Sequence, residues 1–286
     1  MVCTPGRVLD LLERRALNLS SVTHVVLDEA DRMLDMGFQD DMDKIFEAMK
    51  ENPAARQVAL FSATLPPWVQ KVAKKYMAED VVTVDLVEDE SQKAAVSVRH
   101  VAIPCQWTSL AQTIGDVVSL YAGKKGRTIV FCETKKDCNE LCVAGGINVE
   151  CQALHGDISQ QQRETTLTAF KQGRFGVLVA TDVAARGLDM VVDLVINAKP
   201  PVRMSGRADT ETYVHRSGRT GRANRSGVCV TLYTPKYRQA LKDIEREVGN
   251  TFEWRGAPQP HEIIAASGRQ AAEQLDTVDK QAVEVF

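Results

Sequence analysis

The stretch His24–Asp31 (HVVLDEAD) joins a short apolar, β-branched run to three carboxylates within four residues. Such a run predicts a strand, and the carboxyl ends of parallel strands form the edge where α/β folds bind ligands. In nucleotide hydrolases an aspartate at this place holds Mg²⁺, and the next carboxylate orients or deprotonates the attacking water. Taken alone, the acidic stretch is more simply interpreted as a solvated turn.

Apolar runs alternate with amphipathic stretches along the rest of the chain. The predicted strands are His24–Leu27, Gln57–Phe61, Val98–Ile103, Arg127–Phe131, Val149–Leu154, Gly176–Ala180, Leu194–Asn197, Val228–Tyr233 and Thr251–Trp254. The predicted helices are Gly6–Ala16, Phe38–Met49, Trp68–Met77, Lys135–Ala144, Gln160–Lys171, Pro235–Val248 and Pro260–Leu275. This alternation predicts an α/β protein with parallel sheets covered by helices on both faces.

The acidic segment Val87–Lys93 (VEDESQK) is typical of a linker between two α/β units. It divides the chain into residues 1–88, residues 89–248 and a C-terminal extension, 249–286. The first unit is small for a doubly wound domain. Because the chain opens on the last residues of an apolar strand, Met1–Cys3, we expect the first domain to be incomplete.

Composition excludes several classes of protein. The net charge is −3, so nucleic-acid binding must come from a local arrangement of basic groups. No run approaches the roughly 18 apolar residues of a membrane span, and no secretory signal is present. The seven cysteines are scattered without a CxxC pair, which favours free thiols in a reducing compartment. Cys138 and Cys142 share a predicted helix face, but no second ligand pair accompanies them.

The second half of the chain carries an arginine-rich segment. An apolar strand leads into Thr181–Asp189 (TDVAARGLD), and Tyr213–Arg222 (YVHRSGRTGR) follows. There Arg216, Arg219 and Arg222 stand three residues apart among glycines, which permit close approach of the backbone. Arginines placed in this way can converge on a polyphosphate. The alternative is a solvated basic surface.

In their order along roughly residues 1–245, these segments resemble the motifs of the DEAD-box RNA helicases of superfamily 2. The matching segments are TPGR (Thr4–Arg7), VLDEAD (Val26–Asp31), SAT (Ser62–Thr64), IVFCET (Ile129–Thr134), the QxxR pair within His155–Arg163, VATDVAARGLD (Val179–Asp189) and HRSGRTGR (His215–Arg222). The two prolines before the last motif and the later segment Glu262–Ser267 (EIIAAS) resemble the nucleolar Gu-type helicases.

The resemblance implies two RecA-like, doubly wound parallel-sheet domains and an ATP-dependent RNA-remodelling activity with ATP and Mg²⁺ as cofactors. The implied catalytic residues are Asp28, which also holds the metal, Glu29, Arg219 and Arg222. Those implied around the nucleotide are Asp31, Ser62, Thr64, Gly187, Asp189 and His215. Those implied along the RNA backbone, without sequence preference, are Thr4, Pro5, Gly6, Arg7, Gly37, Phe38, Gln160, Arg163, Thr181 and Arg216.

The chain departs from the family pattern at two places. No GxxxxGK[ST] phosphate loop is present, and Gly123–Thr128 lacks the Gly-Lys-Ser/Thr ending. Since phosphoryl transfer depends on positioning and charge stabilisation, we expect this polypeptide alone to hydrolyse no ATP. The segment Lys199–Thr212 is longer than is usual in the family and is predicted to be a surface loop.

Two alternatives remain open at this level. The chain is a piece of an active helicase, or it is a non-catalytic module that binds RNA or a partner through its second domain. Retention of Glu29, Arg219 and Arg222 favours the first, and the missing phosphate loop favours the second. A DNA helicase is a weaker rival. The expected location is the nucleus or nucleolus, or the cytoplasm, and no membrane is expected as a partner.

Overall fold

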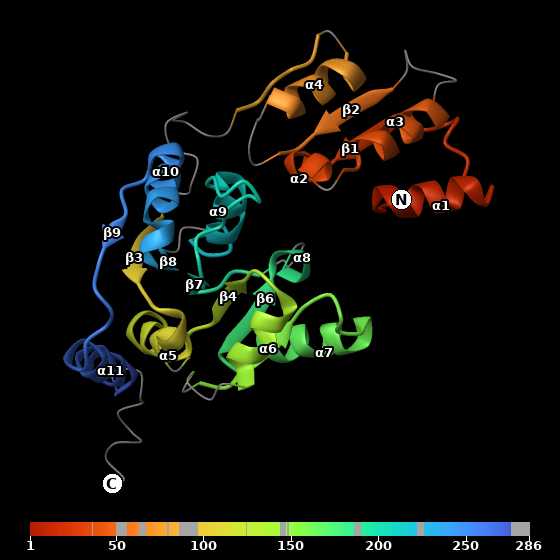
Figure 1. Cartoon of the computed structure of the whole chain (residues 1–286). Helices are drawn as coiled ribbons and strands as arrows, with labels where there is room; N and C mark the ends of the chain where they lie inside the picture. The colour runs from red at the N-terminus through yellow and green to blue at the C-terminus, as the bar shows by residue number, and fades with distance from the viewer. Residues whose placement is uncertain are drawn as a thin grey trace. The chain divides into compact units, whose positions relative to one another are not determined.

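The computed structural model describes residues 1–35, 37–49, 56–62, 67–78, 80–85, 97–123, 125–143, 147, 149–185, 190–221 and 226–275. They belong to two compact units, Met1–Glu88 and Asp89–Phe286, here called unit 1 and unit 2 (Figure 1). The predicted linker Val87–Lys93 lies outside the described residues.

Unit 1 is built on a two-stranded parallel sheet. Its strands β1 (His24–Leu27) and β2 (Gln57–Leu60) pair in register from His24 opposite Gln57 to Leu27 opposite Leu60. The helices are α1 (Pro5–Glu13), α2 (Ala30–Asp35), α3 (Gln39–Ala48) and α4 (Pro67–Tyr76). The apolar face of α3 packs on β1, and the ring of Phe46 stacks on that of Tyr76 at 4.0 Å. The sequence pattern does not predict α2.

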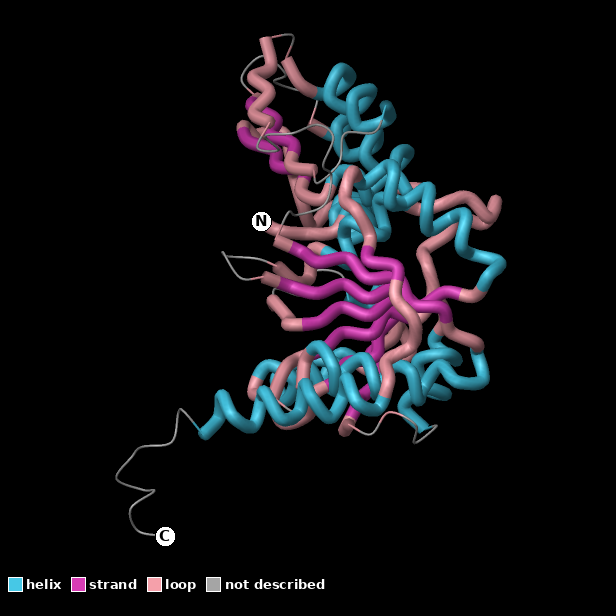
Figure 2. Tube along the Cα trace, turned by 90° about the vertical axis from the view of Figure 1, so that its left-hand side faces the viewer, coloured by secondary structure: helices cyan, strands magenta, loops and turns pink. Residues whose placement is uncertain are grey.

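Unit 2 contains a seven-stranded parallel sheet, which confirms the predicted α/β class. The strands are β3 (Val98–Pro104), β4 (Thr128–Cys132), β5 (Cys151–Leu154), β6 (Val177–Thr181), β7 (Leu194–Asn197), β8 (Gly227–Tyr233) and β9 (Glu253–Trp254). They lie in the order β5-β6-β4-β7-β8-β3-β9, side by side in Figure 2. Every residue of β4, β6 and β7 is buried, as expected for strands covered on both faces.

Helices cover both faces of this sheet. They are α5 (Leu110–Tyr121), α6 (Lys135–Val143), α7 (Gln160–Lys171), α8 (Asp182–Ala185), α9 (Thr210–Ser217) and α10 (Arg238–Val248), with short 3₁₀ turns at Trp107–Ser109 and Pro235–Tyr237. Residues of α5 and α6 share one apolar cluster, whereas residues of α7, α9 and α10 share the other. The Oγ of Ser159 accepts a hydrogen bond from the Gln162 N–H and caps α7. The sequence pattern does not predict α5, α8 or α9.

The C-terminal segment is part of unit 2. Strand β9 pairs with β3 at the edge of the sheet, and the guanidinium of Arg99 forms a two-pronged ion pair with Glu253. Helix α11 (Pro260–Leu275) then packs against α5 (Figure 1). In the described residues, no helix has both the length and the apolar character needed to cross a bilayer.

Candidate functional site

The acidic turn lies at the carboxyl end of β1 and is held by the end of β2. The Phe61 N–H donates to the Leu27 carbonyl oxygen (2.8 Å), and the Ala30 N–H donates to the Phe61 carbonyl oxygen (3.0 Å). Between them, Glu29 takes the left-handed conformation (φ +50°), which is strained for a residue with a side chain. The backbone therefore holds the turn in one conformation and carries Ser62 beside it.

The three carboxylates of the turn have different surroundings. Asp28 is exposed and accepts a hydrogen bond from the Glu29 N–H (2.9 Å), Glu29 is half-buried, and Asp31 is completely buried. An exposed aspartate beside a second carboxylate suits a hard cation that also takes oxygens from phosphate and water. Among the described residues, no three His, Cys, Asp or Glu side chains form a metal-binding group by themselves. The oxygen donors of this turn are chemically compatible with a Mg²⁺ ion that is brought with a nucleotide.

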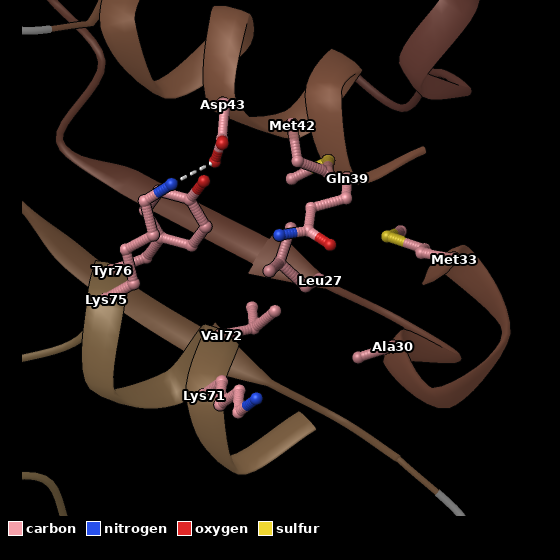
Figure 3. Close-up of a pocket in the computed structure, with 10 residues that line it drawn as sticks. All are labelled: Leu27, Ala30, Met33, Gln39, Met42, Asp43, Lys71, Val72, Lys75 and Tyr76. Carbon is pink, nitrogen blue, oxygen red and sulfur yellow. Dashed lines mark hydrogen bonds and ion pairs between the residues drawn. The ribbon is translucent and has the colours of Figure 1, made fainter. Parts of the chain in front are cut away.

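A small cavity of about 80 Å³ lies on the interior side of the turn, where Leu27 and Ala30 line it (Figure 3). Helices α3 and α4 form its other walls, and Lys75 Nζ pairs with Asp43 Oδ1 at 2.6 Å at its rim. The volume is far below the several hundred Å³ of ligand pockets. This cavity is therefore too small to hold a nucleotide.

The candidate RNA-binding residues of unit 1 lie at its surface. Thr4, Gly6 and Arg7 are exposed at the start of α1, where the Thr4 carbonyl accepts from the N–H groups of Arg7 and Val8 (both 3.1 Å). Gly37 has φ +76° with open space around its Cα. Pro5 at the first helical position and Phe38 before α3 are half-buried.

In unit 2, Arg216 of α9 is buried and donates three side-chain hydrogen bonds to protein groups. Its Nε and Nη2 each donate to a carboxylate oxygen of Asp182 (2.7 Å), and its Nη1 donates to Asn197 Oδ1 (3.0 Å). The guanidinium also lies over the Phe131 ring, 5.2 Å from its centroid. Asn197 Nδ2 continues the network to Thr231 Oγ1 (3.1 Å). These contacts hold α9 against β4, β7 and the residue that follows β6, and Asn197 extends the network to β8.

The turn after α9 carries Arg219, which is buried. Its N–H donates to the Arg216 carbonyl (3.1 Å), and its carbonyl accepts from the Val192 N–H (3.0 Å). Gly221 has φ +69°, and a Cβ there would lie 2.5 Å from Val98 Cγ2. Because Arg216 is fixed, the turn that follows it is fixed as well. Arg222, with Gly187, Asp189 and Thr64, lies outside the described residues.

The QxxR pair lies at the start of α7. Arg163 Nη2 donates to the Ala184 carbonyl of α8 (2.8 Å), while Gln160 Nε2 donates to Glu164 within α7 (2.7 Å). Thr181 is buried at the end of β6, immediately before α8. The structure thus brings Arg163 and the residues after Thr181 together in unit 2.

A buried cluster of His100, Tyr213 and Phe252 packs around the Tyr213 side chain of α9. His100 Nδ1 hydrogen-bonds to the hydroxyl of Tyr213 (2.7 Å), and the His100 ring stacks on Phe252 at 5.3 Å. Burial lowers the pKa of His100 to about 4 and raises the pKa of Tyr213. His215, on the same helix as Tyr213, is half-buried.

The sequence motifs predict no role for two partners of Arg216, Asp182 and Asn197. Asp182 lies within the motif Thr181–Asp189. Asn197 is the last residue of an otherwise apolar strand, Leu194–Asn197, and is buried. A polar residue at the end of a fully apolar strand is the sequence signal that could have indicated the role of Asn197.

Comparison with known proteins agrees with these motifs. The DEAD/DEAH box helicase family matches residues 1–72, the helicase conserved C-terminal domain matches 110–224, and the DDX21/DDX50 dimerisation domain matches 259–286. Nucleolar RNA helicase 2 of Mus musculus is 50% identical over 292 aligned residues, which cover 100% of this chain and 33% of the mouse protein. DEAD-box ATP-dependent RNA helicase 7 of Oryza sativa is 46% identical, with 100% and 40% covered.

The fold is also similar to that of a solved structure. S. cerevisiae Dbp5 bound to RNA and ADP BeF3 superposes with a TM-score of 0.80 at 31% identity, covering 93% of this chain and 68% of that one. The chain spans only about a third of the length of the curated relatives that it matches first.

Proposed function

The chain belongs to the DEAD-box helicase family, and from this premise we propose that it works in an ATP-dependent RNA helicase, which remodels RNA. The observation that carries the proposal is the acidic turn Asp28–Asp31, fixed by backbone hydrogen bonds at the end of β2. Such a turn presents carboxylates at the ligand-binding edge of a parallel sheet.

Each carboxylate of the turn has a separate role in this proposal. The exposed Asp28 holds Mg²⁺, which supplies charge neutralisation to the phosphates. Glu29 accepts a proton from the attacking water, and the buried Asp31 connects the turn to Ser62 and Thr64. From the second domain, Arg219 and Arg222 stabilise charge on the γ-phosphate.

The remaining candidates bind the ribose or the RNA. Gly187, Asp189 and His215 lie around the nucleotide in this proposal. Phosphate contacts position RNA without reading its sequence. The residues proposed for these contacts are Thr4, Pro5, Gly6, Arg7, Gly37, Phe38, Gln160, Arg163 and Thr181. The guanidinium N–H groups of Arg216 donate hydrogen bonds to Asp182 and Asn197. We therefore propose that Arg216 affects RNA binding only by holding α9 in place.

The experiment uses two proteins, the 286-residue chain and a chimera. The chimera places the segment of mouse nucleolar RNA helicase 2 that precedes the matched region before Met1. We expect the chain alone to bind single-stranded RNA without ATP hydrolysis, and the chimera to hydrolyse ATP when RNA is present. In the chimera, Glu29→Gln should lower kcat by at least a hundredfold, whereas the exposed Glu13→Gln should leave it unchanged.

Equal ATPase rates in the Glu29→Gln chimera and its parent would contradict the assignment of the general base. An RNA-stimulated ATPase in the purified 286-residue chain would contradict the requirement for a phosphate loop. If the chimera folds and binds RNA but never hydrolyses ATP, the non-catalytic interpretation holds.

We also propose a nucleolar location, because the mouse and rat relatives are named nucleolar RNA helicases. A fluorescent fusion of the chain should concentrate in nucleoli. Uniform cytoplasmic fluorescence of a protein that still contains residues 1–286 would contradict this location.

The match of residues 259–286 to a dimerisation domain favours self-association as a second function. Helix α11 packs on α5, and within α11 Ala266 is buried whereas Ile264 is exposed. We expect the chain to be a dimer by light scattering. Deleting residues 259–286 should make it a monomer, and an unchanged mass would contradict the proposal.

A further inference from the structure

The connection between β7 and α9 forms a hydrogen-bonded hairpin within Lys199–Thr212, the segment that is longer than is usual in the family. Val202 and Ala208 pair across it in an antiparallel bridge. The Arg203 N–H donates to the Arg207 carbonyl (2.9 Å), and the Gly206 N–H donates to the Arg203 carbonyl (2.8 Å). With Gly206 at φ +78°, this is the three-residue hairpin loop that closes through a left-handed residue.

The register sets which side chains face the solvent. Residues directly opposite in an antiparallel pair share a face, and successive residues alternate between the two faces. Val202 and Ala208 are half-buried, and Ala208 packs against the larger apolar cluster of unit 2. Arg203 and Arg207, one position further along, therefore share the opposite face, and both are exposed.

This face holds two like charges directly opposite one another, an arrangement that is destabilising in a sheet. Arg203 is partly compensated by Glu211 Oε2 at 3.9 Å. Arg207 forms no ion pair with any of the residues described. A bound anion between the two guanidinium groups would remove the repulsion.

The hairpin is anchored at both of its ends. The Asp209 N–H donates to the Pro201 carbonyl (3.0 Å), and the Asp209 carboxylate accepts from the Thr212 N–H (3.1 Å) at the start of α9. The hairpin follows the carboxyl end of β7, and α8 follows the carboxyl end of β6 in the same parallel sheet, so both lie at the same edge. The arginine pair is thus presented on a fixed support at the ligand-binding edge of unit 2.

We propose that Arg203 and Arg207 together bind one phosphate of the RNA backbone, a contact beyond those of the motif residues. The inference rests on the proposed RNA binding by this chain. Arginine matches phosphate through parallel N–H donors, and the hydrogen-bonded hairpin fixes the backbone positions of both arginines, so that binding has to order only their side chains. The contact reads no base, in keeping with binding to the backbone.

The test measures the affinity of the 286-residue chain for a fluorescein-labelled single-stranded oligouridylate at several salt concentrations, by anisotropy. In Arg203→Ala/Arg207→Ala, we expect the affinity to fall roughly five- to tenfold, and the slope of log affinity against log salt to fall by about 0.7, one phosphate contact. Arg203→Lys/Arg207→Lys should keep most of the slope and lose part of the affinity.

The control removes two positive charges from the opposite edge of the same sheet. Lys171 and Arg174 are exposed just before β6, so Lys171→Ala/Arg174→Ala should change the affinity less than twofold. If the wild-type chain binds RNA and the hairpin variant binds with the same affinity and slope, the inference is wrong. If the wild-type chain binds no RNA at all, the proposed RNA binding fails, and this inference fails with it.

Discussion

The guanidinium of Arg216 forms a bidentate ion pair with the carboxylate of Asp182, with Nε and Nη2 each 2.7 Å from a carboxylate oxygen. The Arg216 side chain is only 7% exposed. A buried charge that loses its partner keeps the full cost of its desolvation. The pair therefore joins the start of α8 to α9 and sets the place of Arg219 in the following turn.

Removing one member of this pair should destabilise unit 2 strongly. We expect Asp182→Ala, which leaves the buried guanidinium with Asn197 alone, to lower the free energy of unfolding by about 3–5 kcal/mol. Arg216→Lys should also be costly, because an ammonium cannot form the two parallel bonds. Urea unfolding followed by tryptophan fluorescence gives the values.

The matched control is Arg246→Ala. This arginine is 74% exposed and pairs with Asp243 on α10, so its loss should cost at most about 1 kcal/mol. Equal urea midpoints for Asp182→Ala and Arg246→Ala would show that the Asp182–Arg216 pair does not hold α9.

The second prediction concerns the stability lost when Gly221, in the turn after α9, is replaced by alanine. Gly221→Ala meets both a left-handed φ and a contact of 2.5 Å with Val98 Cγ2. Gly206→Ala in the hairpin meets a similar φ with no atom within 4 Å. We expect losses of stability of about 1–2 kcal/mol at Gly206 and about 3 kcal/mol or more at Gly221. Equal losses would mean that the close approach to Val98 is absent.

Local pattern predicts much of this fold and only part of its site. His24–Leu27, Leu194–Asn197 and Gln160–Lys171 form over the predicted residues, because alternation, β-branching and the Ser159 cap act locally. The local pattern does not predict helix α9, because its sequence TETYVHRS is mostly polar and the helix is held by tertiary hydrogen bonds of Arg216. It does not predict helix α5, because Gly115 and the paired valines suit a strand as well.

In the site as well, features set by local sequence can be predicted, whereas features set by tertiary packing cannot. Carboxylates that follow an apolar strand are visible in sequence, since strand ends of a parallel sheet meet at one edge. The partner of a buried arginine is not visible, because Asp182 and Arg216 are 34 residues apart and meet only when β6 and α9 are packed. Like charges at Arg203 and Arg207 become a pair only through the hairpin register.

His100 makes unit 2 sensitive to mildly acid pH. Burial lowers its pKa to about 4 in the folded state, against about 6.5 in an unfolded chain. Between these values the unfolded state binds more protons, so stability is complete above pH 6.5 and is lost as the pH falls toward 4. From pH 7.5 to 5.0 this residue should remove roughly 2 kcal/mol from the free energy of unfolding.

Urea titrations at the two pH values measure the loss, and His100→Gln provides the comparison. The variant is expected to be less stable at pH 7.5, because the ring stacks on Phe252 and bonds to Tyr213. Its loss between pH 7.5 and 5.0 should be smaller than that of the parent by roughly 2 kcal/mol. An identical loss in both proteins would mean that other groups account for the pH dependence.

The thiols should divide into reactive and protected groups. All seven cysteines are free, Cys3 is exposed, and Cys132, Cys138 and Cys229 are buried. Burial raises the pKa of Cys229 to about 12, so almost no thiolate is present at pH 8. We expect iodoacetamide to modify Cys3 within minutes, and to reach Cys229 only after urea unfolding, as read by mass spectrometry of peptides. Cys3→Ser should remove the fast modification of the peptide that contains residue 3 and leave the protection of Cys229 intact. Rapid modification of Cys229 in the native protein would show that the cluster around Tyr213 opens to solvent, and that the support beneath α9 is looser than this packing implies.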